Sequence, residues 1–197
     1  MFRTIFVAML LLSSGASEGE EKSPGDNPEL KKLFDEDQAD RMPPAGKLIA
    51  NVDWAVVSAR DEVRELRIKE LIQADALGTG ADYYHAAMIL QHASTPNDYL
   101  LAHDLCVVAI GKGVDGAKWL AAASLDRFLT SIDRAQRFGT QFQSKRATQR
   151  PRLLAVDPSV PDSLRRAFNV PTLDEARKNE AQMARQFEEA LRIPMKP

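Results

Sequence analysis

The sequence predicts a mainly α-helical protein, a helical bundle or helical-hairpin array with a small β-hairpin near the C-terminal third. Two observations predict this fold class. Apolar residues recur at helical spacing between short Gly- and Pro-containing turns from residue 28 to residue 132. After residue 140 two short β-prone stretches flank a polar loop. With 197 residues, 44% hydrophobic residues and a net charge of -2, the chain suits one ordinary globular domain, without a global preference for nucleic acid.

The N-terminus has the pattern of a secretory signal peptide. Arg3 precedes a short apolar run over 4–12, and small residues follow at 13–17. We expect residues 1–16 to be the signal, residues 17–27 a disordered acidic spacer and residues 28–193 a single domain. The protein is then exported, periplasmic or secreted, and the alternative is an uncleaved anchor. Because the run is too short to span a bilayer stably, no stable membrane insertion is expected after cleavage.

Cap residues mark the expected helices. Asn27 before Pro28, Thr79 with Asp82, and Thr95 before Pro96 are typical helix starts. The expected helices cover residues 28–42, 53–74 (one helix, or two with a break near Ser58), 81–93, 95–110 and 116–132, followed by a helical turn at 163–168 and a last helix at 172–192. The helix over 81–93 is apolar nearly all round, which predicts a central position. The expected strands are 140–143 and 153–156.

Two pairs of polar residues stand in apolar surroundings. Asp126 and Arg127 lie on the Ala-rich helix over 116–132, with Asp126 on the stripe of Trp119. Gln91 and His92 end the apolar helix over 81–93. Buried charges are costly unless they are paired, so these residues need partners. They either form a structural network with the helix ends or face a ligand.

The hexapeptide over 136–141, Gln-Arg-Phe-Gly-Thr-Gln, joins the helical part to the hairpin. Together with Gln91-His92 and Asp126-Arg127, in that order, it resembles the signature of the bacterial domain-of-unknown-function family 6624. Val160-Pro161-Asp162, Arg165-Arg166 and Val170-Pro171 also fit that family's C-terminal pattern, so that the resemblance covers about Leu30 to Glu175. The resemblance implies one common constellation of His92, Asp126, Arg127, Gln136, Thr140 and Gln141, and it implies no particular chemistry.

The residue types suggest roles within this constellation. His92 titrates near neutral pH and is the expected general acid or base, with Asp126 orienting it or pairing with Arg127. The remaining expected ligand-binding residues are Gln91, Arg127, Gln136, Arg137, Gly139, Thr140 and Gln141. Thr140 as a nucleophile requires a base within hydrogen-bond reach, and otherwise it is a turn residue.

Charge favours an anionic ligand. Residues 134–152 carry six Lys and Arg and no acidic residue, which favours a phosphate or an acidic glycan or peptide, unless this is only a solvated basic loop. Nucleic acid is not expected, because only Phe138 and Phe142 offer stacking rings. The sequence therefore predicts an exported domain that binds a small anionic ligand. The alternatives are a small-substrate hydrolase or transferase that uses His92 and Asp126, and a structural or interaction module.

Motifs for metalloproteases, P-loops, Rossmann folds and serine hydrolases are missing, and no cofactor or metal is expected. One metal alternative remains, an HD-type phosphohydrolase, because His85, His103-Asp104 and Asp126 follow the order H, HD, D. Cys106, the single cysteine, is expected to be a small buried hydrophobe.

Overall fold

The computed structural model describes residues 25–42, 52–143 and 150–192. Its elements are α1 (Pro28–Asp40), α2 (Trp54–Gln73), α3 (Gly80–Leu90), α4 (Pro96–Gly111), α5 (Ala117–Ser131), β1 (Phe142–Gln143), β2 (Arg152–Leu153), α6 (Asp162–Ala167) and α7 (Leu173–Arg192). The mainly α fold with a small C-terminal hairpin is confirmed. The predicted signal over 1–16 lies outside the described residues, as does most of the predicted spacer. None of the described helices combines the length and the apolar composition that a bilayer crossing requires.

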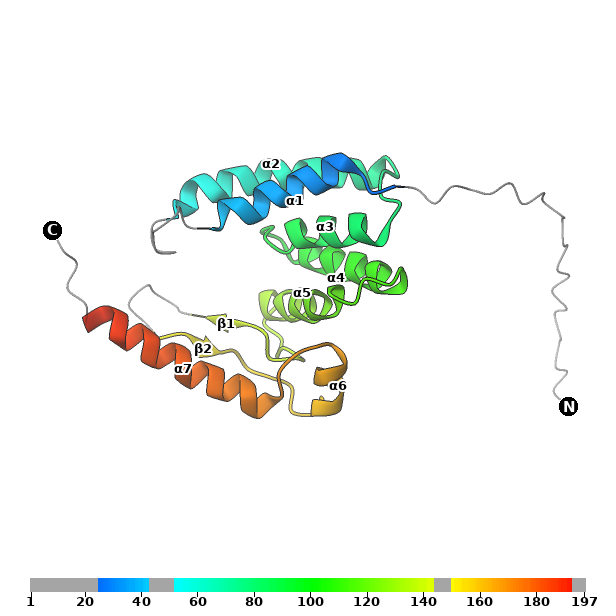
Figure 1. Cartoon of the computed structure of the whole chain (residues 1–197). Coiled ribbons are helices and arrows are strands. Elements are labelled where there is room, and N and C mark those ends of the chain that lie inside the picture. The colour runs from blue at the N-terminus through cyan, green and yellow to red at the C-terminus, as the bar shows by residue number, and fades with distance from the viewer. Residues whose placement is uncertain (1–24, 43–51, 144–149, 193–197) are drawn as a thin grey trace, which may run out of the picture.

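The helices stack in layers (Figure 1). The first layer is formed by α1 and α2, which lie side by side over α3. The central helices α3, α4 and α5 pack on one another, and the hairpin with α7 lies beyond α5. The main core lies between these helices and includes the fully buried Leu30, Ile68, Leu90 and Cys106. The structure confirms that the helix over 81–93 is central and that Cys106 is buried. Burial raises the pKa of the Cys106 thiol to about 12.

Capping explains most of the helix starts. Asn27 accepts hydrogen bonds from the amides of Glu29 and Leu30, and Thr79 with Asp82 forms the predicted capping box. The carboxylate of Asp82 also accepts the backbone N–H of Asn27 at 2.8 Å, which fixes the start of α1 against α3.

Of the two alternatives for the segment over 53–74, the structure has the single continuous helix α2, in which the carboxylate of Asp61 pairs with Arg41 and Arg64. One predicted helix end differs from the structure by three residues. The helix predicted over 81–93 ends at Leu90, and Gln91 and His92 lie in the turn that follows.

The hairpin is short. Phe142 pairs with Leu153 and Gln143 pairs with Arg152 in antiparallel register. Gln136 forms a further bridge to Val156, in which its N–H donates to the carbonyl of Ala155 at 2.9 Å and its own carbonyl accepts from Asp157 at 2.7 Å. The hexapeptide therefore crosses between α5 and the chain that follows β2.

Candidate functional site

The carboxylate of Asp126 is the centre around which the hexapeptide folds. Asp126 is fully buried. Its Oδ1 accepts the backbone N–H groups of Arg137 at 2.7 Å and Phe138 at 2.9 Å, and its Oδ2 accepts the N–H of Thr140 at 3.0 Å and the Thr140 hydroxyl at 2.8 Å. Gly139, with φ +83°, makes the turn that directs these amides at one carboxylate. All of the oxygen lone pairs that point at the loop are used, so Asp126 holds the loop to α5.

Gln136 performs a similar task for the hairpin. Its side chain is fully buried, and its Nε2 donates to the carbonyls of Gln141 and Leu154, both at 3.0 Å. Its Oε1 accepts the N–H of Gln141 at 2.8 Å. The amide thus joins the two ends of the hexapeptide to the chain that follows β2, and protein groups use both of its N–H donors and one lone pair of its oxygen.

Phe138 anchors the middle of the hexapeptide in a second, smaller core. Its side chain is buried with Ala122 and Val170. The ring lies against Phe168 with 4.9 Å between the centroids. Behind Gly139 lies the fully buried Arg165, whose Nη2 donates to the carbonyl of Val160 at 3.4 Å and whose Nε lies 3.5 Å from Asp162 Oδ1. The hexapeptide is therefore fixed from α5, from the hairpin and from α6.

Arg127 occupies a different environment from its neighbour Asp126. Its Nη1 donates to the backbone carbonyl of Gln91, and its Nε donates to Oε1 of Gln141 at 3.4 Å. The guanidinium carbon lies 5.8 Å from the ring centroid of Tyr99, a cation–π distance. Burial lowers the pKa of the Arg127 guanidinium. Among the described residues no carboxylate forms an ion pair with Arg127, so every partner of this half-buried cation there is neutral.

Arg127 lines a surface hollow of about 460 Å³ between α4, α5 and the hairpin. The other lining residues are Tyr99, Thr130, Ser131, Asp133, Arg134, Ala135, Gln143, Leu154 and Ala155. Two hydroxyl groups, a phenol ring and a second guanidinium thus share the hollow with Arg127. Asp133 is its only carboxylate, and it is exposed.

His92 and Arg127 both contact Gln91, His92 at its side chain and Arg127 at its backbone carbonyl. Its Nε2 is 3.4 Å from Nε2 of the buried Gln91 and 3.9 Å from Oδ2 of Asp37. Burial, and next the charges of Arg41, Arg127 and Arg64, lower the pKa of His92 to about 3. His92 is therefore neutral at neutral pH, and its contact with Asp37 is not an ion pair despite the distance. No hydrogen bond joins His92 to Asp126 within the described part of the chain, so the geometry does not form the pair that a hydrolase or transferase would use.

Asp37 is the titratable group beside His92 that sequence reasoning missed. Its carboxyl is fully buried and accepts a hydrogen bond from Gln38 at 2.8 Å. Arg41 Nη1 lies 2.9 Å from Oδ1 but directs its N–H to the Asp37 carbonyl, so Oδ1 gains charge stabilisation without an aligned hydrogen bond. Burial raises the pKa of Asp37 to about 6, although Arg41 acts to lower it.

A network of charges surrounds this pair. Arg41 donates to Asp61 at 2.7 Å, and the buried Arg64 donates to Asp61 at 3.0 Å and to Asp40. In the sequence, this network shows only as oppositely charged residues at helical spacing on two neighbouring helices. A solvent-exposed helix surface has the same pattern, so the sequence does not distinguish the two.

The predicted site residues therefore divide into two groups. Asp126, Gln136, Gly139 and Thr140 form a latch that fixes the hexapeptide. Arg137 contributes its backbone N–H to this latch, and its exposed side chain lies 3.9 Å from Asp157. Gln91, Arg127 and Gln141 form a chain of contacts that leads from His92 to the hollow, and Gln141 also bonds to Gln136 and Thr140 of the latch. The catalytic roles of His92 and Asp126 stay predictions, and for Asp126 the geometry favours the structural alternative.

The metal alternative lacks a site. His103 Nδ1 lies 2.8 Å from the carbonyl of Ala121, and His85 stacks on Phe34 with 4.4 Å between the ring centroids. Over residues 25–42, 52–143 and 150–192 there is no group of three His, Cys, Asp or Glu side chains that could hold a metal ion.

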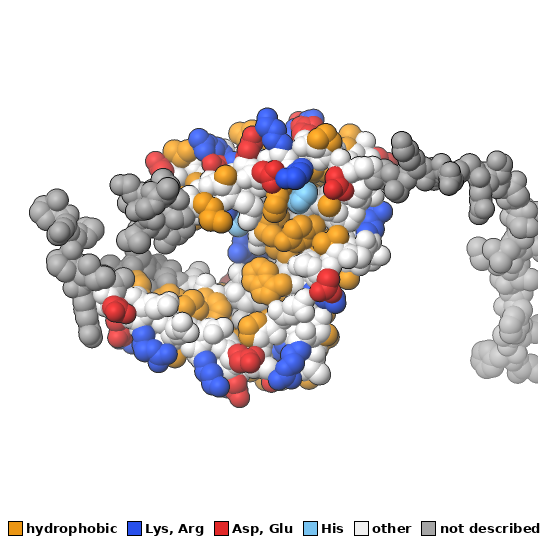
Figure 2. Space-filling view, viewed as in Figure 1, with side chains coloured by type: hydrophobic (Ala, Val, Ile, Leu, Met, Phe, Trp, Pro, Cys, Tyr) orange, Lys and Arg blue, Asp and Glu red, His pale blue; other side chains and the backbone are white. Residues whose placement is uncertain are grey.

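Figure 2 shows that the molecule is hollowed between the layer of α1 and α2 and the layer of the hairpin and α7, and that basic side chains are visible at the inner wall of this notch. Arg127 and the network around His92 belong to the helices on either side of it. Comparisons of the chain with protein-family models, with curated proteins and with solved structures find no match.

Proposed function

We propose that this chain is an exported domain that binds a small anionic ligand, and that Arg127 is the residue that receives the anion. The observation that carries the proposal is the lack of a carboxylate partner for Arg127 among the described residues. A half-buried guanidinium that contacts only neutral oxygens and a ring loses hydration without gaining a counter-charge. A bound anion would supply that charge. Export is proposed from the N-terminal signal pattern alone.

The donors left on Arg127 suit a phosphate or a carboxylate. Arginine has five N–H donors in a planar fork, and the described contacts use the Nε–H and one N–H of Nη1. The Nη2 group remains, and a planar fork can bind two oxygens of one anion. Arg134 lines the same hollow and adds a second guanidinium. Thr130 and Ser131 line it too, although their hydroxyls donate to the carbonyls of Arg127 and Phe128 within α5. A hollow of about 460 Å³ lies at the small-molecule end of ligand sites.

The latch explains why polar residues surround Arg127 without binding the ligand themselves. Asp126 and Gln136 fix the hexapeptide, and the hexapeptide holds Gln141 against Arg127 and against the carbonyl of Ala123 at 3.2 Å. Arg127 is thereby held by rigid neighbours on both sides, which reduces the ordering cost of binding. Membership of family 6624 is part of this proposal, and its support is the order of the motifs in the sequence.

A thermal-shift screen tests the proposal. The panel contains inorganic phosphate, sulfate, small carboxylates, sugar phosphates and acidic cell-wall fragments, against the wild type, Arg127→Gln and the control Arg177→Gln. Arg177 is a solvent-exposed arginine on α7. We expect at least one anion to stabilise the wild type and the control and to lose that effect in Arg127→Gln. The proposal fails if no anion stabilises the wild type, or if the two variants respond equally.

A further inference from the structure

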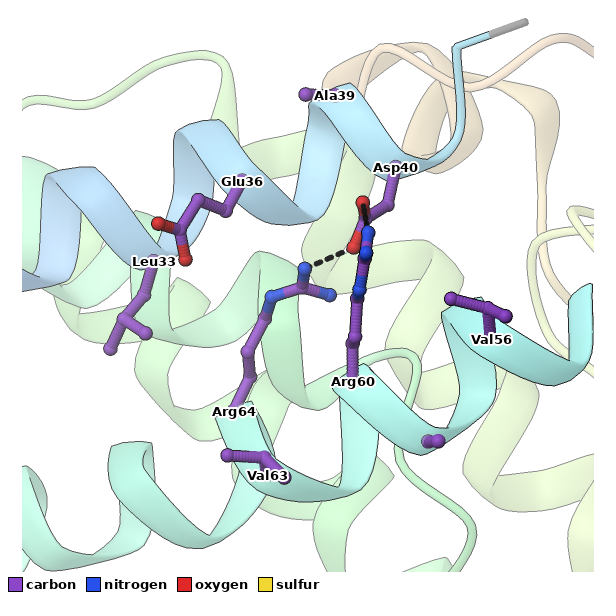
Figure 3. A pocket seen from close by; sticks show the side chains of 9 residues that line it. Leu33, Glu36, Ala39, Asp40, Val56, Arg60, Val63 and Arg64 are labelled. Carbon is purple, nitrogen blue, oxygen red and sulfur yellow. Dashed lines mark hydrogen bonds and ion pairs between the residues drawn. The ribbon is translucent and has the colours of Figure 1, made fainter. Parts of the chain in front are cut away.

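A second concave surface lies between α1 and α2, away from Arg127. It has a volume of about 720 Å³ and is walled by Leu33, Glu36, Ala39 and Asp40 of α1 and by Val56, Ala59, Arg60, Val63 and Arg64 of α2. Figure 3 shows Leu33 and Glu36 directed from α1 toward α2, and Arg60 and Arg64 extended from α2 to Asp40. The ion pairs to Asp40 tie the two helices together, and the apolar side chains beside them remain in contact with solvent.

The outer face of α2 carries an apolar stripe with heptad spacing. Val56, Ala59, Val63 and Leu66 stand at i, i+3, i+7 and i+10, which is the a/d pattern of a coiled-coil seam. All four are exposed, with Val63 at 67% and Leu66 at 64% exposure. Single exposed apolar residues are ordinary, but four on one stripe beside an apolar groove indicate an interaction surface.

We propose that α2 of a second copy of this chain occupies the groove, so that the two stripes meet in a parallel, two-fold symmetric pair flanked by the two α1 helices. Each copy supplies both the stripe and the groove, and a surface of this kind can close a symmetric dimer. The resulting unit is a four-helix bundle of α1 and α2 from both copies. This proposal concerns a different surface from the anion site and does not depend on it.

Charges beside the stripe bear on the direction of the pair. Glu62 and Lys69 lie at g positions and Arg60 and Arg67 at e positions, and Arg67 also pairs with Glu29 and Glu70 of its own chain. In a parallel pair, the g residue of one helix faces the e residue of the next heptad on the other, so Glu62 meets Arg67 of the second copy with opposite charge. In an antiparallel pair, e residues face each other and g residues face each other, so Arg60 would meet Arg67 of the second copy with like charge while Glu62 would meet Lys69 with opposite charge. Of the two orientations, only the parallel one brings no like charges together at the e and g positions, so these charges favour an identical helix in parallel orientation.

Sedimentation of the purified chain tests this proposal. We expect the wild type to dimerise reversibly, and Val63→Lys to raise the dissociation constant at least about tenfold. The control is Val107→Lys, which changes an exposed valine on α4 at 52% exposure and should leave the dissociation constant unchanged. A wild type that stays monomeric at every concentration, or a dimer that Val63→Lys does not weaken, overturns the proposal.

Cross-linking tests the orientation. A parallel pair places residue 63 opposite residue 63 of the second copy, within disulfide reach, so Val63→Cys should form a covalent dimer on oxidation. Ile132→Cys, at 42% exposure beyond the end of α5, is the control and should stay monomeric. The native Cys106 is buried and does not interfere. A dimer that Val63→Lys dissociates but Val63→Cys fails to cross-link overturns the parallel arrangement.

Discussion

Replacing His92 with glutamine should make the stability of this protein fall with pH between about 4 and 6, relative to the wild type. The wild type carries two neighbouring groups whose pKa values are shifted in opposite directions. Burial raises the pKa of Asp37 from 3.8 to about 6, and burial with nearby arginines lowers that of His92 from 6.5 to about 3. The effects of the two groups on stability therefore oppose each other in the same pH window.

The sign of each effect follows from which state binds the proton. Between about pH 4 and 6 the folded protein keeps a proton on Asp37 that the unfolded chain releases, so the free energy of unfolding falls as pH rises. Over the same window the unfolded chain protonates His92 and the folded protein does not, so the free energy of unfolding rises with pH. One pKa unit corresponds to about 1.4 kcal/mol, so each effect amounts to roughly 3 kcal/mol across the window.

In the wild type the two contributions nearly cancel. In His92→Gln only Asp37 remains, so the free energy of unfolding should drop, relative to the wild type, by roughly 3 kcal/mol from pH 4 to pH 6. In Asp37→Asn the change should have the opposite sign. Comparison with the wild type removes the slope that all other carboxylates contribute in common.

Urea denaturation followed by circular dichroism at several pH values measures these differences. The expected result is three curves of stability against pH that diverge with opposite slopes for the two variants. Parallel curves would show that neither pKa is shifted in the folded protein, and the assignment of a neutral His92 beside a protonated Asp37 would then be wrong.

Three further variants test the latch. Asp126→Asn should cost about 3 kcal/mol or more of unfolding free energy, because buried N–H donors lose a charged acceptor, and the exposed Asp104→Asn should cost under about 0.5 kcal/mol in the same urea assay. Gln136→Leu should cost about 2 to 3 kcal/mol and should speed amide hydrogen exchange in the hairpin, since two carbonyls and one N–H lose their partner; unchanged exchange would contradict this role. Gly139→Ala should cost about 1 to 2 kcal/mol because its φ is positive, whereas Gly111→Ala, at a helical glycine with open space, should not destabilise. Equal thermal midpoints for the two glycine variants would refute the strain at Gly139.

The helices were predictable where local chemistry determines them. Asn27 with Pro28 and Thr79 with Asp82 satisfy backbone N–H groups within a few residues, so the sequence contains the whole interaction. The end of α3 was predicted three residues late because Gln91 and His92 leave the helix for contacts with residues distant in the sequence, Arg127 and Asp37.

The interior of the site was predictable only in part. Helical spacing put Asp126 on the stripe of Trp119, yet Asp126 is fully buried and Trp119 is 45% exposed. The two positions differ by only about 20° around the helix, so the difference in burial arises from the loop that covers Asp126 and comes from another part of the chain. Asp37 carried no motif at all, because its burial arises from tertiary packing. Likewise, only the structure shows that the apolar Val63 and Leu66 of α2 face outward.

The most direct test of the central claim is an NMR titration that detects the Nε–H of Arg127 while the best anion of the thermal-shift panel is added. The resonance is assigned by its absence from Arg127→Lys. We predict a saturable shift of this resonance at the concentrations that stabilise the protein, with no comparable shift of the Arg177 resonance. An anion that stabilises the protein while the Arg127 resonance stays unchanged would contradict the assignment of Arg127 as the anion-binding residue.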